Sequence, residues 1–332
     1  MEEVIKYLMD IYNLHGYKLT LIPKHIGGRN IVYVCEKDGE NKFVLRISPL
    51  EDRILEDYLA ETEFVHYLSL NGALVADVIP SINSKYVETI NYGEKTLYVS
   101  MFDYAKGILI KDNDYHYRDG VSINEYFYNV GKVLGSIHKL SKKFISTFEC
   151  VSYFDKYNKE YIDELIPDTY RELKNAIFGR LKEFEQLPTS NEVFGLIHFD
   201  FGDGNYHIDM NTGNITVFDF ETCIYCWYLF DLANLWIQGV GWYESETDYV
   251  KRMNLLVNYF NIILEGYKSE TNVCDSLLER LPLFIDMVLI ENIVDDFEYS
   301  IRNNEDVDYN EIKNKAKALI EDFVYIGENI KY

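Results

Sequence analysis

Runs of hydrophobic residues between about residues 17 and 48 predict β-strands near the start of the chain. The segments IVYVCE and KFVLRI are rich in β-branched and aromatic residues, and they flank KDGEN. In that segment, Asp38 and Gly39 form a dipeptide that favours a two-residue hairpin turn. The same strand-like pattern returns in residues 84–90 and 95–102. The first third of the chain therefore predicts an antiparallel sheet.

One stretch inside this region has the period of a helix. Within residues 51–70, four hydrophobic residues recur on one helical stripe: Ile54, Tyr58, Val65 and Leu68. Asn71 and Gly72 follow as a stop signal. We expect one helix to accompany the sheet.

The remainder of the chain is mainly helical. Ser122 and Glu125 form a capping-box pattern ahead of an amphipathic stretch, and residues 155–186 also have helical periodicity. Two short strand-like segments, FGLIHFDF and NITVFDF, precede further helices. The sequence thus predicts an α+β fold with two lobes, an antiparallel β lobe with one helix over residues 1–104 and a larger, mainly α-helical lobe over residues 105–332.

Charge and composition exclude several classes of protein. The 332 residues include 32 Lys and Arg against 55 Asp and Glu, a formal net charge of -23. Such a surface repels phosphate backbones and anionic membranes, so we expect no nucleic-acid or membrane partner. No stretch approaches about 18 consecutive apolar residues, and the N-terminus has no basic, apolar leader, which favours a cytoplasmic protein. The C-x-x-C of Cys223 and Cys226 lies in apolar surroundings, which predicts buried packing.

The residues that carry chemistry lie in LIHFDFGDGNYHIDMNTGNITVFDFE. His198, Asp200 and Asn205 have the order H-x-D-x-x-x-x-N, and Asp219 follows fourteen residues later in D-F-E. Phosphoryl transfer needs a carboxylate to accept the proton of the attacking hydroxyl, and oxygen ligands that hold Mg²⁺ against the nucleotide phosphates. We expect this segment to supply both.

These positions predict distinct roles. Asp200 is the candidate base, and Asn205 and Asp219 are candidate Mg²⁺ ligands. Glu221 either contributes to the metal site or points elsewhere. His198 is expected to support the backbone of the loop, and His138, on an apolar helix face, to be a core residue.

The predicted sheet supplies candidates for nucleotide binding. In KHIGGRNIVYV, Gly27 and Gly28 allow close approach of the backbone to phosphates, with Arg29 and Asn30 beside them. A paired glycine in a tight hairpin is the alternative explanation. FVLRI lies where a kinase sheet carries V-A-I-K, so Arg46 would contact the phosphates.

A buried arginine needs a carboxylate partner, and the helix of residues 51–70 offers two. At about 100° per residue, Glu61 falls within the apolar stripe, whereas Glu63 points to the opposite face. A glutamate on an apolar face is unfavourable without a partner. The sequence therefore predicts an ion pair between Arg46 and Glu61.

Together these motifs resemble the aminoglycoside phosphotransferase and choline kinase superfamily, over roughly residues 20–240. IHFDFGDGN, VFDFE and LFDLAN are the most specific part of the likeness. The resemblance implies a bilobed protein-kinase-like fold, ATP and Mg²⁺ as cofactors, and a small-molecule hydroxyl as acceptor. It also implies that Asp231 braces the catalytic loop, and that MFDYAKG is the hinge that holds adenine, through the backbone of Met101, Phe102 and Tyr104. The glycine-poor loop and the arginine at position 46 depart from the family pattern.

The acceptor and some alternatives stay open. A serine/threonine protein kinase would need a peptide-docking segment after Asp219, where this chain continues ETCIYCWYLFDLANLW. A catalytically silent nucleotide-binding or scaffold relative is the other alternative. Acidic residues of the helical lobe would suit a cationic amino-alcohol or aminoglycoside-like acceptor, and tryptophans could add an aromatic site for an ammonium group: Asp203, Glu244, Glu291, Asp295, Asp296, Trp227, Trp236 and Trp242.

Overall fold

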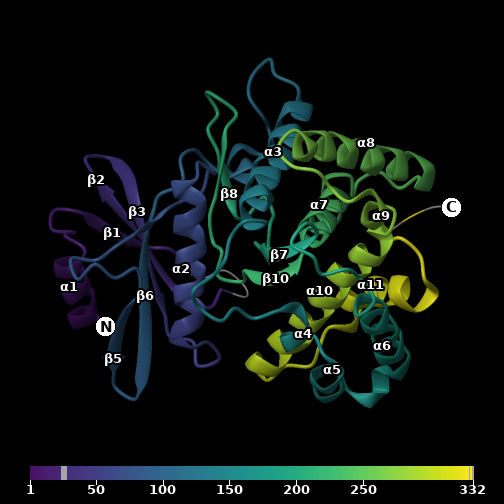
Figure 1. The fold of residues 1–332 in the computed structure, drawn as a ribbon, viewed down its shortest axis with the longest axis horizontal. Helices are drawn as coiled ribbons and strands as arrows, with labels where there is room; N and C mark the ends of the chain where they lie inside the picture. The colour runs from purple at the N-terminus through teal and green to yellow at the C-terminus, as the bar shows by residue number, and fades with distance from the viewer. Residues whose placement is uncertain (24–27, 329, 331–332) are drawn as a thin grey trace.

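The computed structural model describes residues 1–23, 28–328 and 330. Its first part consists of a sheet with two helices, shown in purple and blue in Figure 1. The elements of this part are α1 (Glu2–Ile11), β1 (Lys18–Leu21), β2 (Ile31–Lys37), β3 (Glu40–Ser48), α2 (Leu55–Leu70), β4 (Val78–Ile79), β5 (Glu88–Tyr92) and β6 (Lys95–Asp103).

The sheet is antiparallel throughout. Its strand order is β1-β2-β3-β6-β4, and β5 also pairs with β6. The predicted hairpin between β2 and β3 is confirmed, because Asp38 and Gly39 both have the positive φ values, 55° and 79°, that such a turn requires. Alternation along β3 separates Leu45 and Ile47, which are buried in a core shared with α1, from Arg46 between them.

The helices of this part differ from the prediction in two ways. The expected single helix, α2, is present, but α1 is a second one, and it packs its residues Val4, Leu8 and Ile11 into the core of the sheet. The spacing of those side chains, four and then three residues, is a signal from which α1 could be predicted. Ile54 does not belong to the buried stripe of α2, because it is the N-cap residue and is 59% exposed.

The second part is mainly helical and is shown in teal, green and yellow in Figure 1. The predicted helix over residues 155–186 is broken near Asn158 and Pro167, where the chain starts new helical segments. The elements are η1 (Ile110–Asn113), α3 (Ile123–Ser141), α4 (Tyr153–Lys156), α5 (Lys159–Leu165), η2 (Asp168–Tyr170), α6 (Arg171–Phe184), β7 (Phe194–Ile197), β8 (Tyr206–Ile208), β9 (Ile215–Val217), β10 (Ile224–Trp227), α7 (Tyr228–Trp242), α8 (Tyr249–Lys268), α9 (Asp275–Leu278), α10 (Leu281–Asn303) and α11 (Tyr309–Glu321).

The capping box predicted at the start of α3 is present only in part. Ser122 caps α3 by accepting a hydrogen bond from the Asn124 N–H at 3.2 Å. Glu125, however, pairs with Arg118, so the reciprocal half of the predicted capping box is not made.

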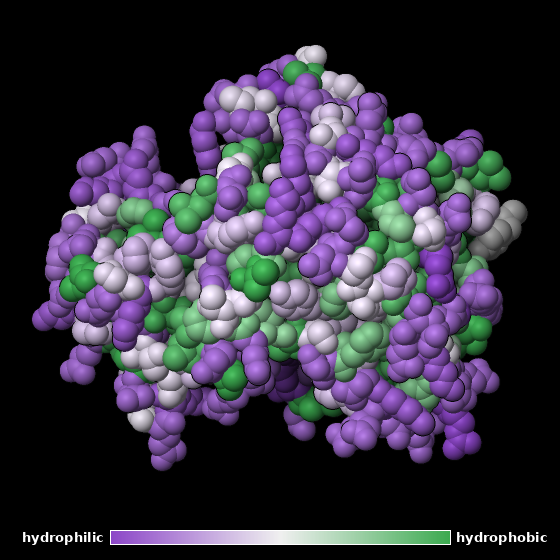
Figure 2. Space-filling view, in the orientation of Figure 1, coloured by the Kyte–Doolittle hydropathy of each residue, from purple (hydrophilic) through white to green (hydrophobic). Residues whose placement is uncertain are grey.

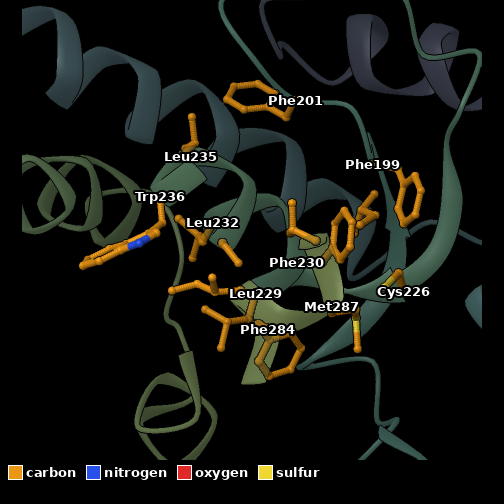
Figure 3. Packing of buried hydrophobic residues seen from close by; sticks show 14 of the residues in the cluster. Phe199, Phe201, Cys226, Leu229, Phe230, Leu232, Leu235, Trp236, Phe284 and Met287 are labelled. Carbon is orange, nitrogen blue, oxygen red and sulfur yellow. The ribbon is translucent and has the colours of Figure 1, made fainter. Parts of the chain in front are cut away.

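A large core joins α3, α7, α8 and α10 with the short strands. Figure 3 shows part of it, including Phe199 and Phe230, whose rings stack 4.4 Å apart. Cys226 lies in this core and Cys223 packs against it, which confirms the predicted packing role. The three tryptophans also belong to the core or pack against it, so they are core residues: Trp227, Trp236 and Trp242.

The face of the molecule in Figure 2 is mostly hydrophilic, with scattered hydrophobic patches. Among the helices in the described part of the chain, none has both the length and the apolar character needed to cross a lipid bilayer.

Candidate active site

A cavity of about 1900 Å³ lies between the sheet and the helical part. Val44 and Phe102 of the sheet line one side of it. The segments 199–205 and 218–224 and the helix α10 contribute to the other side. The cavity therefore brings the two halves of the predicted site together.

Asp200 and Asn205 lie in the loop between β7 and β8. The Asn205 amide nitrogen donates to the Asp200 carboxylate and to the Asp200 carbonyl oxygen, at 2.8 Å each. Because the nitrogen faces Asp200, the amide oxygen of Asn205 is left for another partner. Burial raises the pKa of Asp200, and the charge of His198 and the hydrogen bond from Asn205 offset part of that rise.

Asp231 of α7 holds this loop in place through hydrogen bonds to its backbone. Its fully buried carboxylate accepts hydrogen bonds from the backbone N–H groups of His198 and Phe199, at 3.1 and 2.9 Å. It also contacts Nε2 of His138 at 3.1 Å. Phe199 has a φ of 72°, so the loop has a left-handed residue at the braced position. The predicted brace is confirmed, as is the prediction that His138 is a buried core residue.

His198 has the supporting position that we expected. Its Nε2 lies 3.0 Å from the Phe218 carbonyl oxygen, which connects the loop after β7 to the segment that carries Asp219. The two segments with catalytic candidates are thereby tied to each other.

Asp219 and Glu221 follow β9 and face the same cavity. Asp219 has a φ of 63°, a conformation that Asp tolerates better than most residues. Burial and then the neighbouring charge of Glu221 raise the pKa of Asp219. A cation at this position would relieve that repulsion.

The candidate metal ligands near Asp219 are of the chemical type that a divalent cation prefers, although the described residues contain no cluster of three or more His, Cys, Asp or Glu side chains that could hold a metal ion. The donor set consists of the Asp219 and Glu221 carboxylates and the amide oxygen of Asn205, and Mg²⁺ and Ca²⁺ both prefer such hard oxygen ligands. One Glu221 oxygen, however, accepts a hydrogen bond from the Asn30 side chain, so Glu221 is partly engaged.

Arg46 and Glu61 form the predicted ion pair. The two terminal nitrogens of Arg46 each lie 2.8 Å from a Glu61 oxygen, and Glu61 is fully buried. Burial disfavours the charged guanidinium, but Glu61 more than offsets this and raises the pKa of Arg46. Arg46 also lies 3.7 Å from Asp219 and 3.8 Å from Glu221. The pair therefore stands beside the candidate cation site.

Glu63 faces elsewhere, as its helical position predicts. Its carboxylate accepts hydrogen bonds from Ser146 and Thr147. Sequence reasoning missed Arg53, whose Nη2 lies 3.5 Å from Glu61 and whose guanidinium stacks on Tyr58 at 4.1 Å.

The phosphate-loop candidates are placed in part. Gly27 lies outside the described residues. Gly28, Arg29 and Asn30 line the cavity. Arg29 pairs with Asp52, and Asn30 joins Glu221 to Ser48, whose hydroxyl donates to Asn30 at 2.6 Å.

Of the hinge candidates, Phe102 and Tyr104 line the cavity and Met101 does not. Met101 is 2% exposed and packs in the core of the sheet, between β3 and β4. The Tyr104 N–H already donates to the Lys42 carbonyl at 2.9 Å. Asp103 and Ala105, which the motif comparison did not single out, also line the cavity.

Several of the acidic residues weighed as acceptor ligands also line the cavity, namely Asp203, Glu291, Asp295 and Asp296. Glu244 is not among the lining residues. Glu298 of α10 and Lys156 of α4, which sequence reasoning missed, lie beside them, and no local motif marks either one.

Comparison with known proteins is consistent with this geometry. The chain is 26% identical over 274 residues to amicoumacin kinase of Bacillus subtilis (strain 168), which covers 82% of this chain and 78% of that protein. The structure of an amicoumacin kinase in complex with AMP-PNP, Ca²⁺ and Ami has a TM-score of 0.80 at 21% identity and covers 97% of this chain and 93% of that one. A microcompartment-associated aminopropanol kinase has a TM-score of 0.71 at 16% identity, covering 98% and 100%.

These likenesses confirm the predicted α+β, bilobed protein-kinase-like fold. The sequence profile of the phosphotransferase enzyme family matches residues 22–258 of the chain. That match extends over well more than half of the molecule, includes every described residue of the candidate site up to α8, and confirms the predicted phosphotransferase class. The chain belongs to the phosphotransferase enzyme family.

Proposed function

We propose that this protein transfers the γ-phosphate of ATP to a hydroxyl of a small molecule that carries an amine. In this proposal residues 1–104 form the nucleotide-binding lobe and residues 105–332 the catalytic and acceptor-binding lobe. The observation that carries it is the convergence of Asp200, Asn205, Asp219 and the Arg46–Glu61 pair on one cavity.

Asp200 is the proposed base. Its environment raises the pKa of its carboxyl, which improves a carboxylate as proton acceptor for an alcohol. Asn205 fixes one carboxylate oxygen, and the other accepts no side-chain hydrogen bond from the described residues, so it can meet the acceptor hydroxyl. The buried brace from Asp231 holds the loop in place, so the base needs little reorganisation during the reaction.

Asn205, Asp219 and Glu221 are the proposed ligands of a divalent cation, which we assign as Mg²⁺. When bound, the cation would neutralise charge on the phosphate oxygens during transfer. The amide oxygen of Asn205 is available because its nitrogen is engaged by Asp200. Glu221 divides its contacts between this site and Asn30.

Nucleotide binding involves the sheet side of the cavity. We propose that Arg46, oriented by Glu61, contacts the nucleotide phosphates. Gly27, Gly28, Arg29 and Asn30 are the proposed phosphate-binding loop. For the hinge, the buried position of Met101 favours the backbone beyond Phe102 as the partner of adenine, at a polar atom other than the Tyr104 N–H, which donates to the Lys42 carbonyl.

The acceptor is proposed to be cationic. The wall of the cavity around α10 is acidic, and carboxylates stabilise an ammonium group more than they stabilise a neutral alcohol. The names of the relatives, amicoumacin kinase and aminopropanol kinase, are consistent with an amine-bearing acceptor.

A peptide acceptor is less consistent with the chain after Asp219. Only a short turn and β10 separate Asp219 from α7, which begins at Tyr228 and is mostly buried. Little of that segment is free to dock a substrate peptide.

The test is a screen for ADP release with ATP and Mg²⁺ over hydroxylated amines, aminoglycosides, amino acids, neutral sugars and generic proteins. We expect acceptor-dependent ADP release with an amine-bearing alcohol, at a rate about 10²- to 10⁴-fold lower with the Asp200→Asn variant. Release only with proteins would replace this proposal by a protein kinase, and no release with any acceptor would favour a silent relative.

A further inference from the structure

Three carboxylates line one face of α10 at the acceptor side of the cavity. Glu291, Asp295 and Glu298 are four and three residues apart, so they follow one another along a single helix face. α4 lies beside this face in Figure 1, and its last residue, Lys156, reaches across. The structure thus places an internal cation within an acidic wall.

Lys156 is bound to two of the three carboxylates. Its Nζ lies 3.3 Å from Oε1 of Glu298 and 3.8 Å from Oδ1 of Asp295. Glu298 also accepts a hydrogen bond from the hydroxyl of Tyr161. These two carboxylates are therefore already satisfied without a ligand.

Glu291 is different. The amide nitrogen of Asn292 donates to it at 2.8 Å, but no Lys, Arg or His among the described residues comes within 4.0 Å of its carboxylate. Burial and then the charge of Asp295 raise the pKa of Glu291 well above its usual range, and Asp200 adds to this. Glu291 thus forms hydrogen bonds with Asn292 and Asp295, but it has no cationic partner among the described residues and faces the same space as the candidate base.

Tyr157 provides a second and independent sign of a ligand. It is fully buried, and its hydroxyl has no hydrogen-bond partner in the described structure. The ring lines the cavity, and the charges of Glu291 and Asp295 act on the hydroxyl. A buried hydroxyl without a partner is unfavourable, and a polar ligand in this position would satisfy it.

We propose that Glu291 and the Tyr157 hydroxyl receive one ammonium group of the acceptor, and that Lys156 is a tethered counter-ion that keeps a second ammonium group away from Asp295 and Glu298. This inference rests on the proposed function and narrows its acceptor to a compound with a single ammonium group near the reacting hydroxyl. Lys156 is accordingly a specificity residue, acting by exclusion of charge.

The test uses three probes with one carbon skeleton: 1,2-propanediol, 1-amino-2-propanol and 1,3-diamino-2-propanol. They carry no amine, one amine and two amines. Two readouts are made with each probe: phosphoryl transfer from ATP, as kcat/KM, and the rise in melting temperature that the probe causes in the presence of AMP-PNP and Mg²⁺. In the wild type we expect 1-amino-2-propanol to give a higher kcat/KM and a larger rise in melting temperature than either of the other two probes.

Two substitutions separate the roles. Glu291→Gln keeps the shape of the side chain but removes its charge, and should lower kcat/KM for the monoamine about 10- to 100-fold, toward the value of the neutral probe. Lys156→Met should raise the kcat/KM for the diamine relative to the kcat/KM for the monoamine. The matched controls are Glu305→Gln, at an exposed position after α10, and Lys159→Met, whose Nζ lies over Phe178 instead of in the cavity. Both controls should retain wild-type selectivity.

The outcomes are distinguishable. If the wild type does not discriminate among the probes by either readout, or if Lys156→Met leaves the ratio of diamine to monoamine unchanged, the ammonium subsite is wrong. If the probes are discriminated in binding but no phosphoryl group is transferred to any alcohol, the subsite stands and the proposed function is wrong.

Discussion

The pair of Arg46 and Glu61 allows a quantitative test of how the nucleotide side of the site is built. Both side chains are almost completely buried, and two contacts of 2.8 Å join them. Removing one partner of a buried ion pair costs about 3–5 kcal/mol, because the other charge is left without compensation. Arg46 retains Asp219 and Glu221 at 3.7 and 3.8 Å, so we expect the lower end of that range for Glu61→Ala.

The opposite variant, Arg46→Ala, leaves Glu61 with Arg53 at 3.5 Å as its remaining partner. Each single variant should therefore lose about 3 kcal/mol of unfolding free energy and also bind ATP more weakly. The double variant should be less destabilised than the sum of the two by about 1–3 kcal/mol, because no stranded charge remains.

The assay is urea unfolding of the wild type, both single variants and the double variant, with ATP affinity measured by calorimetry. Glu63→Ala is the matched control, since Glu63 is on the same helix but binds Ser146 and Thr147. Its effect should add to that of Arg46→Ala. Additivity of Arg46→Ala with Glu61→Ala within about 0.5 kcal/mol would refute the pairing.

Three further predictions concern single aspartates of the mainly helical part. Asp219→Ala should weaken Mg²⁺-dependent nucleotide binding as well as turnover, and an unchanged Mg²⁺ dependence in calorimetry would contradict its assignment as a ligand. Asp231→Asn should lose about 1–3 kcal/mol in urea unfolding and lower kcat, because its amide nitrogen replaces one of the two carboxylate oxygens and one of the two buried backbone N–H groups loses its acceptor, whereas wild-type stability would exclude the brace. A hydrogen bond from Lys106 lowers the pKa of Asp209 to about 2. The ionised carboxylate therefore adds about 1 kcal/mol to the free energy of unfolding, after allowance for solvent screening. This stabilisation is fully present above about pH 4 and is lost as the pH falls through about 2. Asp209→Asn should then be less stable than the wild type at pH 7 and equally stable near pH 2, and a difference independent of pH would contradict this.

The grouping of the proposed catalytic residues in one cavity was predictable because these residues are local in sequence. Asp200, Asn205 and Asp219 lie within twenty residues, and the hairpin between β8 and β9 fixes their relative positions. The partner of Arg46 was predictable for a related reason, because a helical stripe specifies which face of α2 carries Glu61.

Features that depend on tertiary packing were not predictable in the same way. Alternation along β6 does not tell which face meets the cavity, and Met101 lies on the core side. Among the three carboxylates on this face of α10, Glu291 has no Lys, Arg or His within 4.0 Å in the described part of the chain, and this can be seen only when Lys156 of α4 is found to pair with Asp295 and Glu298. Ile54 left the apolar stripe because the helix begins one residue after it.

The central claim is that Asp200 acts as the base of a transfer from ATP to an alcohol. The most direct measurement is single-turnover transfer of labelled γ-phosphate from ATP to 1-amino-2-propanol, or to the best amine-bearing alcohol of the screen, by the wild type and by Asp200→Asn. We expect labelled phosphate ester with the wild type, and a rate about 10²- to 10⁴-fold lower with the variant at similar ATP affinity. Transfer by the variant at near wild-type rate would contradict the account.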